Sequence, residues 1–190
     1  VTLSTSVTSP APVATMVTFS PQVADGGGTN LWYRFRVRRH GGEYQMVRDY
    51  GPVQTLDWTA AKREGVYEVE VSVRDLDTGD EATGQSLFQF QSRVTDGQPV
   101  VSPTNNSLVF LYSAPGCDAG SRMRVEFQSA AGTPQSTPFA GCTPGASMNF
   151  YLAGLTANTE YTAHHVIDTG SAFVAGPEVK FTSGDLPPGL

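Results

Sequence analysis

The strongest structural signal in this chain of 190 residues is the segment Leu31-Trp32-Tyr33-Arg34-Phe35-Arg36-Val37-Arg38. Its odd positions are apolar, and its even positions hold one tryptophan and three arginines. Successive side chains of a β-strand point to opposite faces of the sheet, so the segment predicts a strand with one buried and one polar face. A single solvated face is typical of antiparallel sheets.

The same alternation recurs along the rest of the chain. Residues 65–73 place Tyr67 and three valines on one face and are expected to expose Glu68 and Glu70 on the other. Further inward rows are Phe88 and Phe90; Met123, Val125 and Phe127; Met148, Phe150 and Leu152; Tyr161, Ala163, His165 and Ile167; and Val179 with Phe181. Turn clusters separate the rows at 25–28, 41–42, 77–80 and 175–177. The pattern predicts an all-β chain of two tandem antiparallel β-sandwiches.

Composition and charge exclude several classes of protein. Only 16% of the residues are charged and the net charge is −6, which disfavours a nucleic-acid partner, since phosphates need a basic surface. The longest apolar run, 108–112, is far shorter than the ~20 residues of a membrane helix, so no membrane span is expected. Residues 1–9 have neither a basic start nor an apolar stretch, so the chain is expected to be a mature or trimmed product.

A polar cluster near the middle of the chain predicts a domain boundary. Thr95-Asp96-Gly97-Gln98-Pro99 ends one series of strands, and Val100-Val101 begins the next. The predicted domains are therefore 1–97 and 98–190, and the second ends in a linker over 183–190, which is rich in Gly and Pro.

The only two cysteines are Cys117 and Cys142, each in a turn-like context. No histidine or cysteine lies at zinc-finger spacing from them, so no metal site is predicted. We favour a disulfide, which implies an oxidising compartment and an extracellular or periplasmic protein. The alternative is a pair of free thiols in a cytosolic protein.

A resemblance to known modules concerns the turn before one of the last strands. Leu152-Ala-Gly-Leu-Thr-Ala-Asn-Thr-Glu-Tyr161, followed by a strand and by residues 179–184, resembles a fibronectin type III module. In that fold a tyrosine near the start of strand F anchors a corner through its hydroxyl. The resemblance gives this role to Tyr161.

The first half carries a comparable corner. Leu56-Asp-Trp58 and Gly65-Val-Tyr67 resemble the corresponding strand junction of bacterial immunoglobulin-like modules. Trp58 and Tyr67 would form the corner there. A likeness at this level implies an immunoglobulin-like fold and little about activity.

A more specific resemblance covers residues 104–186. These residues are similar to the modules that precede the catalytic propeller in some bacterial arylsulfotransferase-like proteins. The likeness is carried by 104–109, 113–117, 123–128 and 147–154, and it includes both cysteines in order. It implies the front end of an exported enzyme, with a C-terminal catalytic domain in the same polypeptide. The family's catalytic residues belong to the propeller, so this fragment itself is expected not to be an enzyme and to need no cofactor.

One strand face combines aromatic rings with cations. A possible ligand surface is formed by Trp32, Arg34, Arg36, Tyr44 and Tyr50, with Arg38 and Arg39 beside Trp32 on the same strand. Trp58 could join Trp32, Tyr44 and Tyr50 in a carbohydrate platform, but a tryptophan in a sandwich is more often part of the core. Such a surface could take an anion or an acidic or sulfated sugar through charge-assisted hydrogen bonds. The favoured alternative is that the arginines, Arg38 included, pair across strands with Glu68 and Glu70.

Two further clusters of polar residues could form a metal or acid–base site, but each has a simpler structural explanation. His164 and His165 could form a metal or acid–base pair, but neighbours on a strand face opposite ways, so a buried and a surface histidine are favoured. Residues 75–81 resemble the start of a calcium loop, but a hairpin turn is favoured between two strong strands.

Together these observations predict non-catalytic modules. We expect an accessory spacer or docking unit of an exported bacterial protein, ahead of an arylsulfotransferase-like domain. The alternative is a module that binds a glycan or another cell-surface component. An enzyme acting within these residues is the third possibility.

Overall fold

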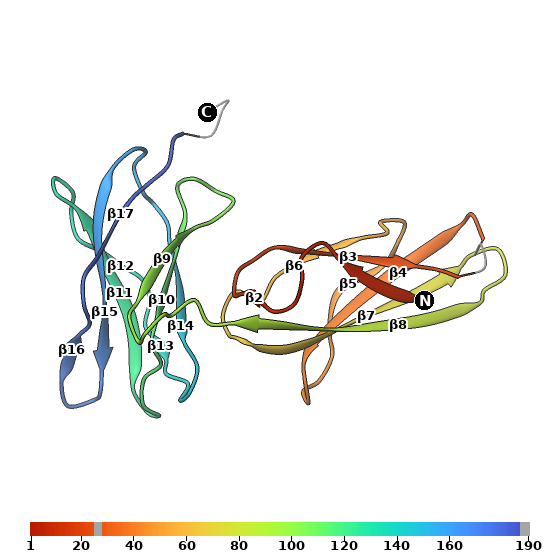
Figure 1. The fold of residues 1–190 in the computed structure, drawn as a ribbon, viewed down its shortest axis with the longest axis horizontal. Coiled ribbons are helices and arrows are strands. Elements are labelled where there is room, and N and C mark those ends of the chain that lie inside the picture. Colours follow the sequence, from red (N-terminus) through yellow and green to blue (C-terminus); the bar gives the residue numbers. More distant parts are fainter. Residues whose placement is uncertain (25–27, 187–190) are drawn as a thin grey trace. The chain divides into compact units, whose positions relative to one another are not determined.

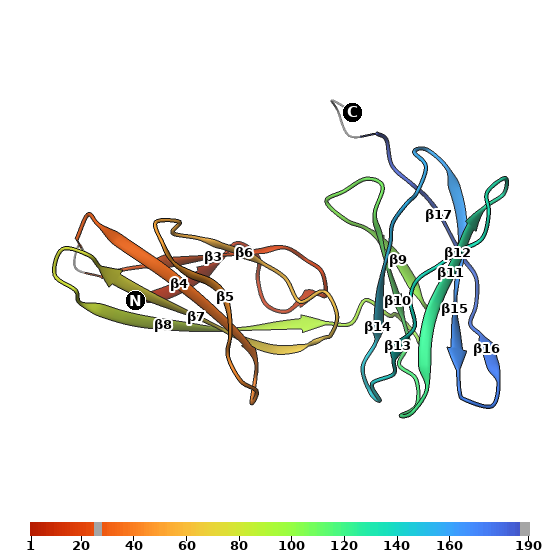
Figure 2. The same cartoon turned by 180° about the vertical axis from the view of Figure 1, so that it is seen from behind.

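All regular elements of the computed structural model are β-strands (Figures 1 and 2). The structure describes residues 1–24 and 28–186, and no helix occurs among them. Most of the turn expected at 25–28 and the end of the linker expected at 183–190 lie outside the described residues. The chain divides into two compact units, Val1–Ala60 with Glu64–Gln91 and Ala61–Arg63 with Ser92–Leu190. The prediction of an all-β chain is confirmed.

The first unit contains two sheets. Their strands are β1 (Thr2–Thr5), β2 (Ala11–Pro12), β3 (Val17–Gln22), β4 (Leu31–Arg39), β5 (Gln45–Gly51), β6 (Leu56–Trp58), β7 (Gly65–Asp75) and β8 (Glu81–Gln91). A three-stranded sheet has the order β1-β3-β6, and a five-stranded sheet has the order β2-β8-β7-β4-β5. Crossovers between two such sheets are typical of an immunoglobulin-type sandwich.

One strand pair departs from the antiparallel prediction. β2 runs parallel to β8, with Ala11 opposite Phe90, whereas the other pairs of this unit are antiparallel. The chain leaves the first sheet after β1 and joins the second at β2, so it arrives running in the direction of β8. Two-residue strands such as β2 carry no alternation that a sequence pattern could detect.

The core of the first unit is formed by the inward rows of both sheets. Phe19 of β3 lies edge-on to Phe88 of β8, with ring centroids 6.0 Å apart. Trp58 of β6 similarly meets Phe90 at 5.8 Å. Both phenylalanines of β8 are buried, as are Tyr33, Phe35 and Val37 of β4 and Val69, Val71 and Val73 of β7. The predicted inward rows of these strands are confirmed, except that Leu31 and Tyr67 at their ends are only half-buried.

The second unit contains a three-stranded sheet of order β14-β10-β9 and a six-stranded sheet of order β12-β11-β15-β16, in which β13 also pairs with β11 and β17 with β15. Its strands are β9 (Val100–Pro103), β10 (Phe110–Ala114), β11 (Arg122–Ser129), β12 (Gln135–Ser136), β13 (Ala140–Gly141), β14 (Met148–Leu152), β15 (Glu160–Asp168), β16 (Phe173–Ala175) and β17 (Val179–Thr182). A tight turn precedes the first of them, with φ of 51° at Asp96 and 70° at Gly97.

The inward rows of these two sheets share one core. Tyr112 of β10 and Leu152 of β14 are fully buried against Met123 and Val125 of β11. Burial of a large apolar side chain contributes about 1.5–3 kcal/mol, so these rows supply most of the folding energy of the unit. The rows predicted for β11, β14 and β15 are confirmed.

A disulfide joins two connections that flank this core. Cys117 lies between β10 and β11, and Cys142 directly follows β13; their Cα atoms are 5.3 Å apart. Both half-buried side chains pack against the core. The Cys142 N–H also donates to the Ser121 carbonyl, at 2.9 Å, which fixes this corner. The prediction of a disulfide is confirmed.

The hydroxyl of Tyr161 ties the start of β15 to the preceding turn. It accepts a hydrogen bond from the Thr156 N–H at 2.9 Å, while its buried ring stacks on Phe181 of β17 at 5.6 Å. Tyr161 thereby holds together a turn and two strands.

Replacing Tyr161 with phenylalanine is expected to lower the free energy of unfolding by about 1 kcal/mol, because the hydrogen bond to Thr156 is lost and the ring stays. Urea unfolding measures the loss. Tyr151→Phe is the control, since that side chain is 46% exposed and its change should have no effect. Equal stability of the two variants would contradict a structural role for the Tyr161 hydroxyl.

Candidate functional site

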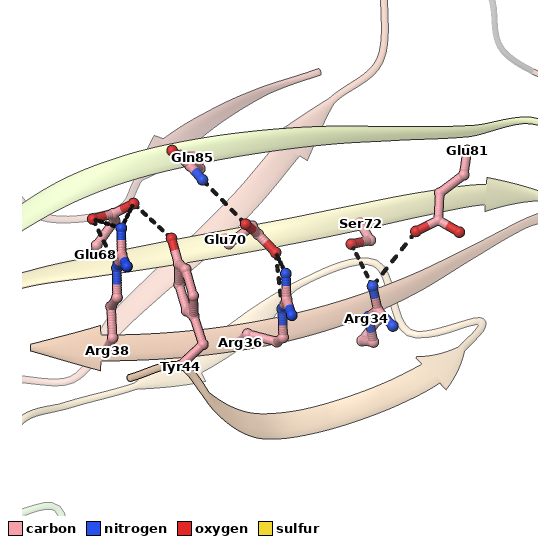
Figure 3. A network of polar contacts seen from close by, with 9 residues as sticks. All are labelled: Arg34, Arg36, Arg38, Tyr44, Glu68, Glu70, Ser72, Glu81 and Gln85. Carbon is pink, nitrogen blue, oxygen red and sulfur yellow. Dashed lines mark hydrogen bonds and ion pairs between the residues drawn. The ribbon is translucent and has the colours of Figure 1, made fainter. Parts of the chain in front are cut away.

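The outer face of the five-stranded sheet carries the residues predicted as a ligand surface. Trp32, Arg34 and Arg36 lie on β4, Tyr44 directly precedes β5, and Tyr50 lies within it. Figure 3 shows Arg34, Arg36 and Tyr44 beside the carboxylates of β7 and of the start of β8. Of the predicted set, Trp32 is 38% exposed.

The arginines of β4 pair with glutamates that lie directly opposite them. Arg36 faces Glu70 in the register of β4 and β7, and its Nε donates to Glu70 Oε1 at 2.9 Å. Arg38 faces Glu68 and holds both carboxylate oxygens at 2.9–3.1 Å. The favoured prediction of cross-strand pairing is therefore confirmed for these two pairs.

The exposure predicted for the two glutamates is wrong. Glu68 is only 7% exposed and Glu70 only 6%. The long arginine side chains and the ring of Tyr44 cover them, and the Tyr44 hydroxyl donates to Glu68 at 2.6 Å. β7 is thus buried on both faces. Its inner face packs against apolar side chains, and its outer face is covered by arginine and tyrosine side chains.

The remaining arginine of the predicted set uses a different partner. Arg34 donates from Nη2 to the Ser72 hydroxyl at 3.1 Å and approaches Glu81 at 3.5 Å. Glu81 lies closer to Arg74, at 3.0 Å. Arg34 is therefore held by one hydrogen bond and one long ion pair, and its buried Nε has no hydrogen-bond partner among the described residues.

Each tyrosine of the surface lies between two guanidinium groups. The ring of Tyr44 is 4.2 Å from the Arg38 guanidinium carbon and 5.0 Å from that of Arg36. Tyr50 is 4.2 Å from Arg74 and 4.7 Å from Arg34. These distances are within the range of cation–π attraction. We call the four arginines and two tyrosines, with Glu68, Glu70 and Glu81, the arginine–tyrosine ladder.

The ladder shifts the acidity of its members. Burial, followed by the hydrogen bond to Glu68, raises the pKa of Tyr44 to about 12. The same hydrogen bond lowers the pKa of Glu68, and Arg38 lowers it further. Both shifts favour the pair as found, a neutral phenol donating to a charged carboxylate.

The Tyr44 phenol is expected to stay protonated between its ordinary pKa of about 10 and its raised value of about 12. In that window the unfolded chain has already lost the proton, so the stability that Tyr44 contributes below pH 10 disappears as the pH rises. Ultraviolet titration of phenolate should show a late-titrating group that Tyr44→Phe removes. Stability that falls equally in both proteins over this window would contradict the assignment.

The two neighbouring histidines point to opposite faces of β15, as predicted. His165 is buried, and its Nδ1 lies 2.9 Å from the hydroxyl of Tyr112 in the facing sheet. Burial lowers the pKa of His165. His164 lies on the other face, with Nε2 3.6 Å from Glu126. The two rings do not share a site.

The acidic segment 75–81 forms the predicted hairpin turn between β7 and β8. The Asp75 N–H donates to the Asp80 carbonyl at 2.9 Å, and Gly79 adopts a φ of 81°. Asp75 Oδ1 accepts the Asp77 N–H at 2.8 Å, so this carboxylate organises the turn. Within residues 1–24 and 28–186 no group of three or more His, Cys, Asp or Glu residues could hold a metal ion.

The residues of the first-half corner also lie together. Trp58 of β6 meets Tyr67 of β7 edge-on, with ring centroids 5.3 Å apart. Sequence reasoning placed these two rings in a structural corner and also considered Trp58 for a carbohydrate platform. It did not connect the rings with Arg39 and Glu43 of the β4–β5 hairpin. That neighbourhood depends on how the hairpin bends over the sandwich, which alternation does not encode.

In the part of the chain that the structure describes, no helix is long and apolar enough to cross a membrane.

Comparisons with known proteins give limited information. No protein-family model and no curated protein matches the sequence. Among solved structures, the chain is similar to the FN1–FN3 domains of chicken CNTN1, with 13% identity over 97% of this chain and 68% of that chain and a TM-score of 0.39. It is also similar to the chicken interferon gamma receptor alpha chain, with 10% identity over 95% and 97% of the two chains and a TM-score of 0.36. A cytokine receptor complex gives 16% identity over 98% of both chains and a TM-score of 0.37. Similarities this weak carry no argument about function, and the assignment of two β-sandwiches rests on the strand order of this chain.

Proposed function

We propose that the chain is a pair of non-catalytic modules, 1–97 and 98–190, that act as a spacer or docking unit in an exported protein. The observation that carries this proposal is the arginine–tyrosine ladder. Arg36, Arg38 and Arg74 pair with its carboxylates, and Tyr44 donates to Glu68, whereas Arg34 Nε and the Tyr50 hydroxyl have no hydrogen-bond partner among the described residues. Most of the polar groups of this face are therefore used to stiffen a sheet. A reactive site needs polar groups that remain available to a substrate.

The disulfide supports export. A bond between Cys117 and Cys142 persists in an oxidising compartment and is rare in the cytosol of mesophiles. An extracellular or periplasmic location follows from this proposal. Expression in an oxidising and a reducing compartment, with free thiols counted in each product, tests it: equal folding yield and stability without the disulfide would argue against export.

A more specific proposal is that the modules precede an arylsulfotransferase-like catalytic domain. The resemblance of residues 104–186 to modules of bacterial arylsulfotransferase-like proteins is its only support. Peptide mapping of the natural polypeptide is the direct test, with peptides from a propeller domain expected beyond Leu190. A natural polypeptide without such a domain would refute the proposal, and so would transfer of sulfate from a phenolic sulfate by residues 1–190 alone.

A second candidate function is binding of a glycan or cell-surface component by Trp32, Arg34, Arg36, Tyr44 and Tyr50. The observation in its favour is the 38% exposure of Trp32 beside the ladder. Glycan-array binding by the intact chain and by Trp32→Ala and Tyr44→Ala variants distinguishes the two functions. A saturable signal that both variants lose would favour binding over a spacer.

A further inference from the structure

A pocket in the first unit lies at the end of the ladder, and Arg38 belongs to both. It has a volume of about 340 Å³ and opens between the β4–β5 hairpin and β6. Its walls include Arg39, Glu43, Gln45, Val47, Trp58 and Tyr67. The volume is within the range of small-molecule sites.

One wall of the pocket is apolar and aromatic. Trp58 and Tyr67 are half-buried and meet edge-on at 5.3 Å, so their packing against each other fixes the orientation of both rings. Val47, which is 42% exposed, extends this wall along β5. A rigid, partly exposed indole is a good surface for the apolar face of a ring.

The other wall carries a guanidinium that has no hydrogen-bond or ion-pair partner within residues 1–24 and 28–186. Arg34, Arg36 and Arg38 of β4 are all paired with protein groups. Arg39 follows them on the same strand, is exposed, and forms no side-chain hydrogen bond or ion pair with any described residue. Its Nε lies over Gly65, where an added Cβ would be only 3.0 Å away. The absence of a side chain at Gly65 thus leaves room for the guanidinium next to the pocket.

Two polar side chains complete this wall. Glu43 and Gln45 are exposed, and neither has a side-chain partner among the described residues. A carboxylate that accepts and an amide that both donates and accepts suit several hydroxyl groups. An aromatic acid without hydroxyl groups would bring no donor to the Glu43 carboxylate, whereas a sugar ring brings several.

We propose that this pocket binds an acidic pyranose, a hexuronate unit of a glycan. The ring lies on Trp58, the carboxylate accepts two hydrogen bonds from Arg39, and the hydroxyls bond to Glu43 and Gln45. Guanidinium and carboxylate match in a bidentate geometry that a lysine does not provide. This site goes beyond the proposed spacer function, which needs no ligand, and it is distinct from the surface around Trp32.

Tryptophan fluorescence provides the test. The chain has two tryptophans, so Trp32→Phe leaves Trp58 as the only reporter. We expect an oligomer of galacturonic acid to change the emission of this variant saturably, and the matching galactose oligomer to bind at least tenfold more weakly. A third titration uses the galacturonic acid monomer. Comparing its affinity with that of the oligomer shows whether the pocket binds a free sugar or a unit within a chain.

Substitutions in the same background locate the ligand. Arg39→Gln is expected to weaken binding of the galacturonate oligomer by ~10-fold or more, because a charge-assisted pair is lost. Arg39→Lys should recover only part of the loss. Arg74→Gln is the matched control, since it removes the same charge from the same sheet outside the pocket, and it should leave affinity unchanged.

Three results would overturn the proposal. These are no saturable change with either acidic probe, equal affinity for the neutral oligomer, and equal losses in Arg39→Gln and Arg74→Gln. Circular dichroism of each variant establishes that the protein is folded. Because Arg39 is exposed and its side chain has no polar partner in the part of the chain that the structure describes, its replacement should not change the fold.

Discussion

Replacing Gly176 with alanine is expected to lower the free energy of unfolding of the second unit by about 3 kcal/mol, the upper end of typical overpacking costs. An added Cβ at this position would lie 2.1 Å from Cε1 and 2.3 Å from Nε2 of His165. The His165 ring is buried and is held from its other side by the Tyr112 hydroxyl, at 2.9 Å. It therefore cannot move aside without breaking the hydrogen bond that links the two sheets.

Chemical denaturation of matched variants measures this effect. Gly141→Ala is the control, because a Cβ there meets nothing within 4 Å and the residue lies on β13 of the same sheet. It should change stability by a few tenths of a kcal/mol at most. In a His165→Ala background the cost of Gly176→Ala should largely disappear, since the ring that causes the clash is absent. An undiminished cost in that background would show that the clash with His165 is not the cause.

Removal of the disulfide is expected to have a comparable effect. Cys117 and Cys142 are separated by 25 residues, and closing a loop of that size stabilises the folded state by about 3 kcal/mol in the chain-entropy model. The double variant Cys117→Ser and Cys142→Ser should therefore unfold at a lower temperature and a lower urea concentration. Calorimetry should show the change in the transition of the second unit.

Reduction of the unmodified protein serves as the internal comparison. A phosphine reductant should lower its unfolding temperature toward that of the double serine variant and leave the variant itself unchanged. If reduction opens the bond, as shown by a thiol count, without any loss of stability, the disulfide does not stabilise this unit.

The sequence was sufficient to predict the longer strands with alternating apolar residues, such as β4, β7, β11 and β15, and their buried faces. Rows such as Tyr33, Phe35 and Val37 have one face in contact with the core, so alternation reports burial directly. The burial of Glu68 and Glu70 could not be predicted this way, because their cover consists of charged and phenolic side chains from other strands. A glutamate on an alternating strand looks the same in sequence whether water or an arginine covers it.

The sequence predicted which residues form the candidate site, but it did not predict how their side chains are arranged. The alternation on β4 placed Arg34, Arg36 and Trp32 on one face correctly. That Tyr44 and Tyr50 lie between guanidinium groups depends on the β4–β5 pairing, whose register shifts between Tyr33 and Arg36. A bulge of this kind moves later residues relative to the neighbouring strand and leaves no clear mark in the sequence.

The parallel pair in the first unit has a mechanical consequence. β2 and β8 run in the same direction, with Ala11 opposite Phe90, and the Val13 N–H donates to the Gln91 carbonyl at 2.9 Å. Tension applied to the two ends of this unit pulls β2 and β8 in opposite directions along their common axis. The hydrogen bonds between them are then loaded in shear, so they resist together and do not open one after another. The β2–β8 pair can therefore carry force along the polypeptide by resisting shear.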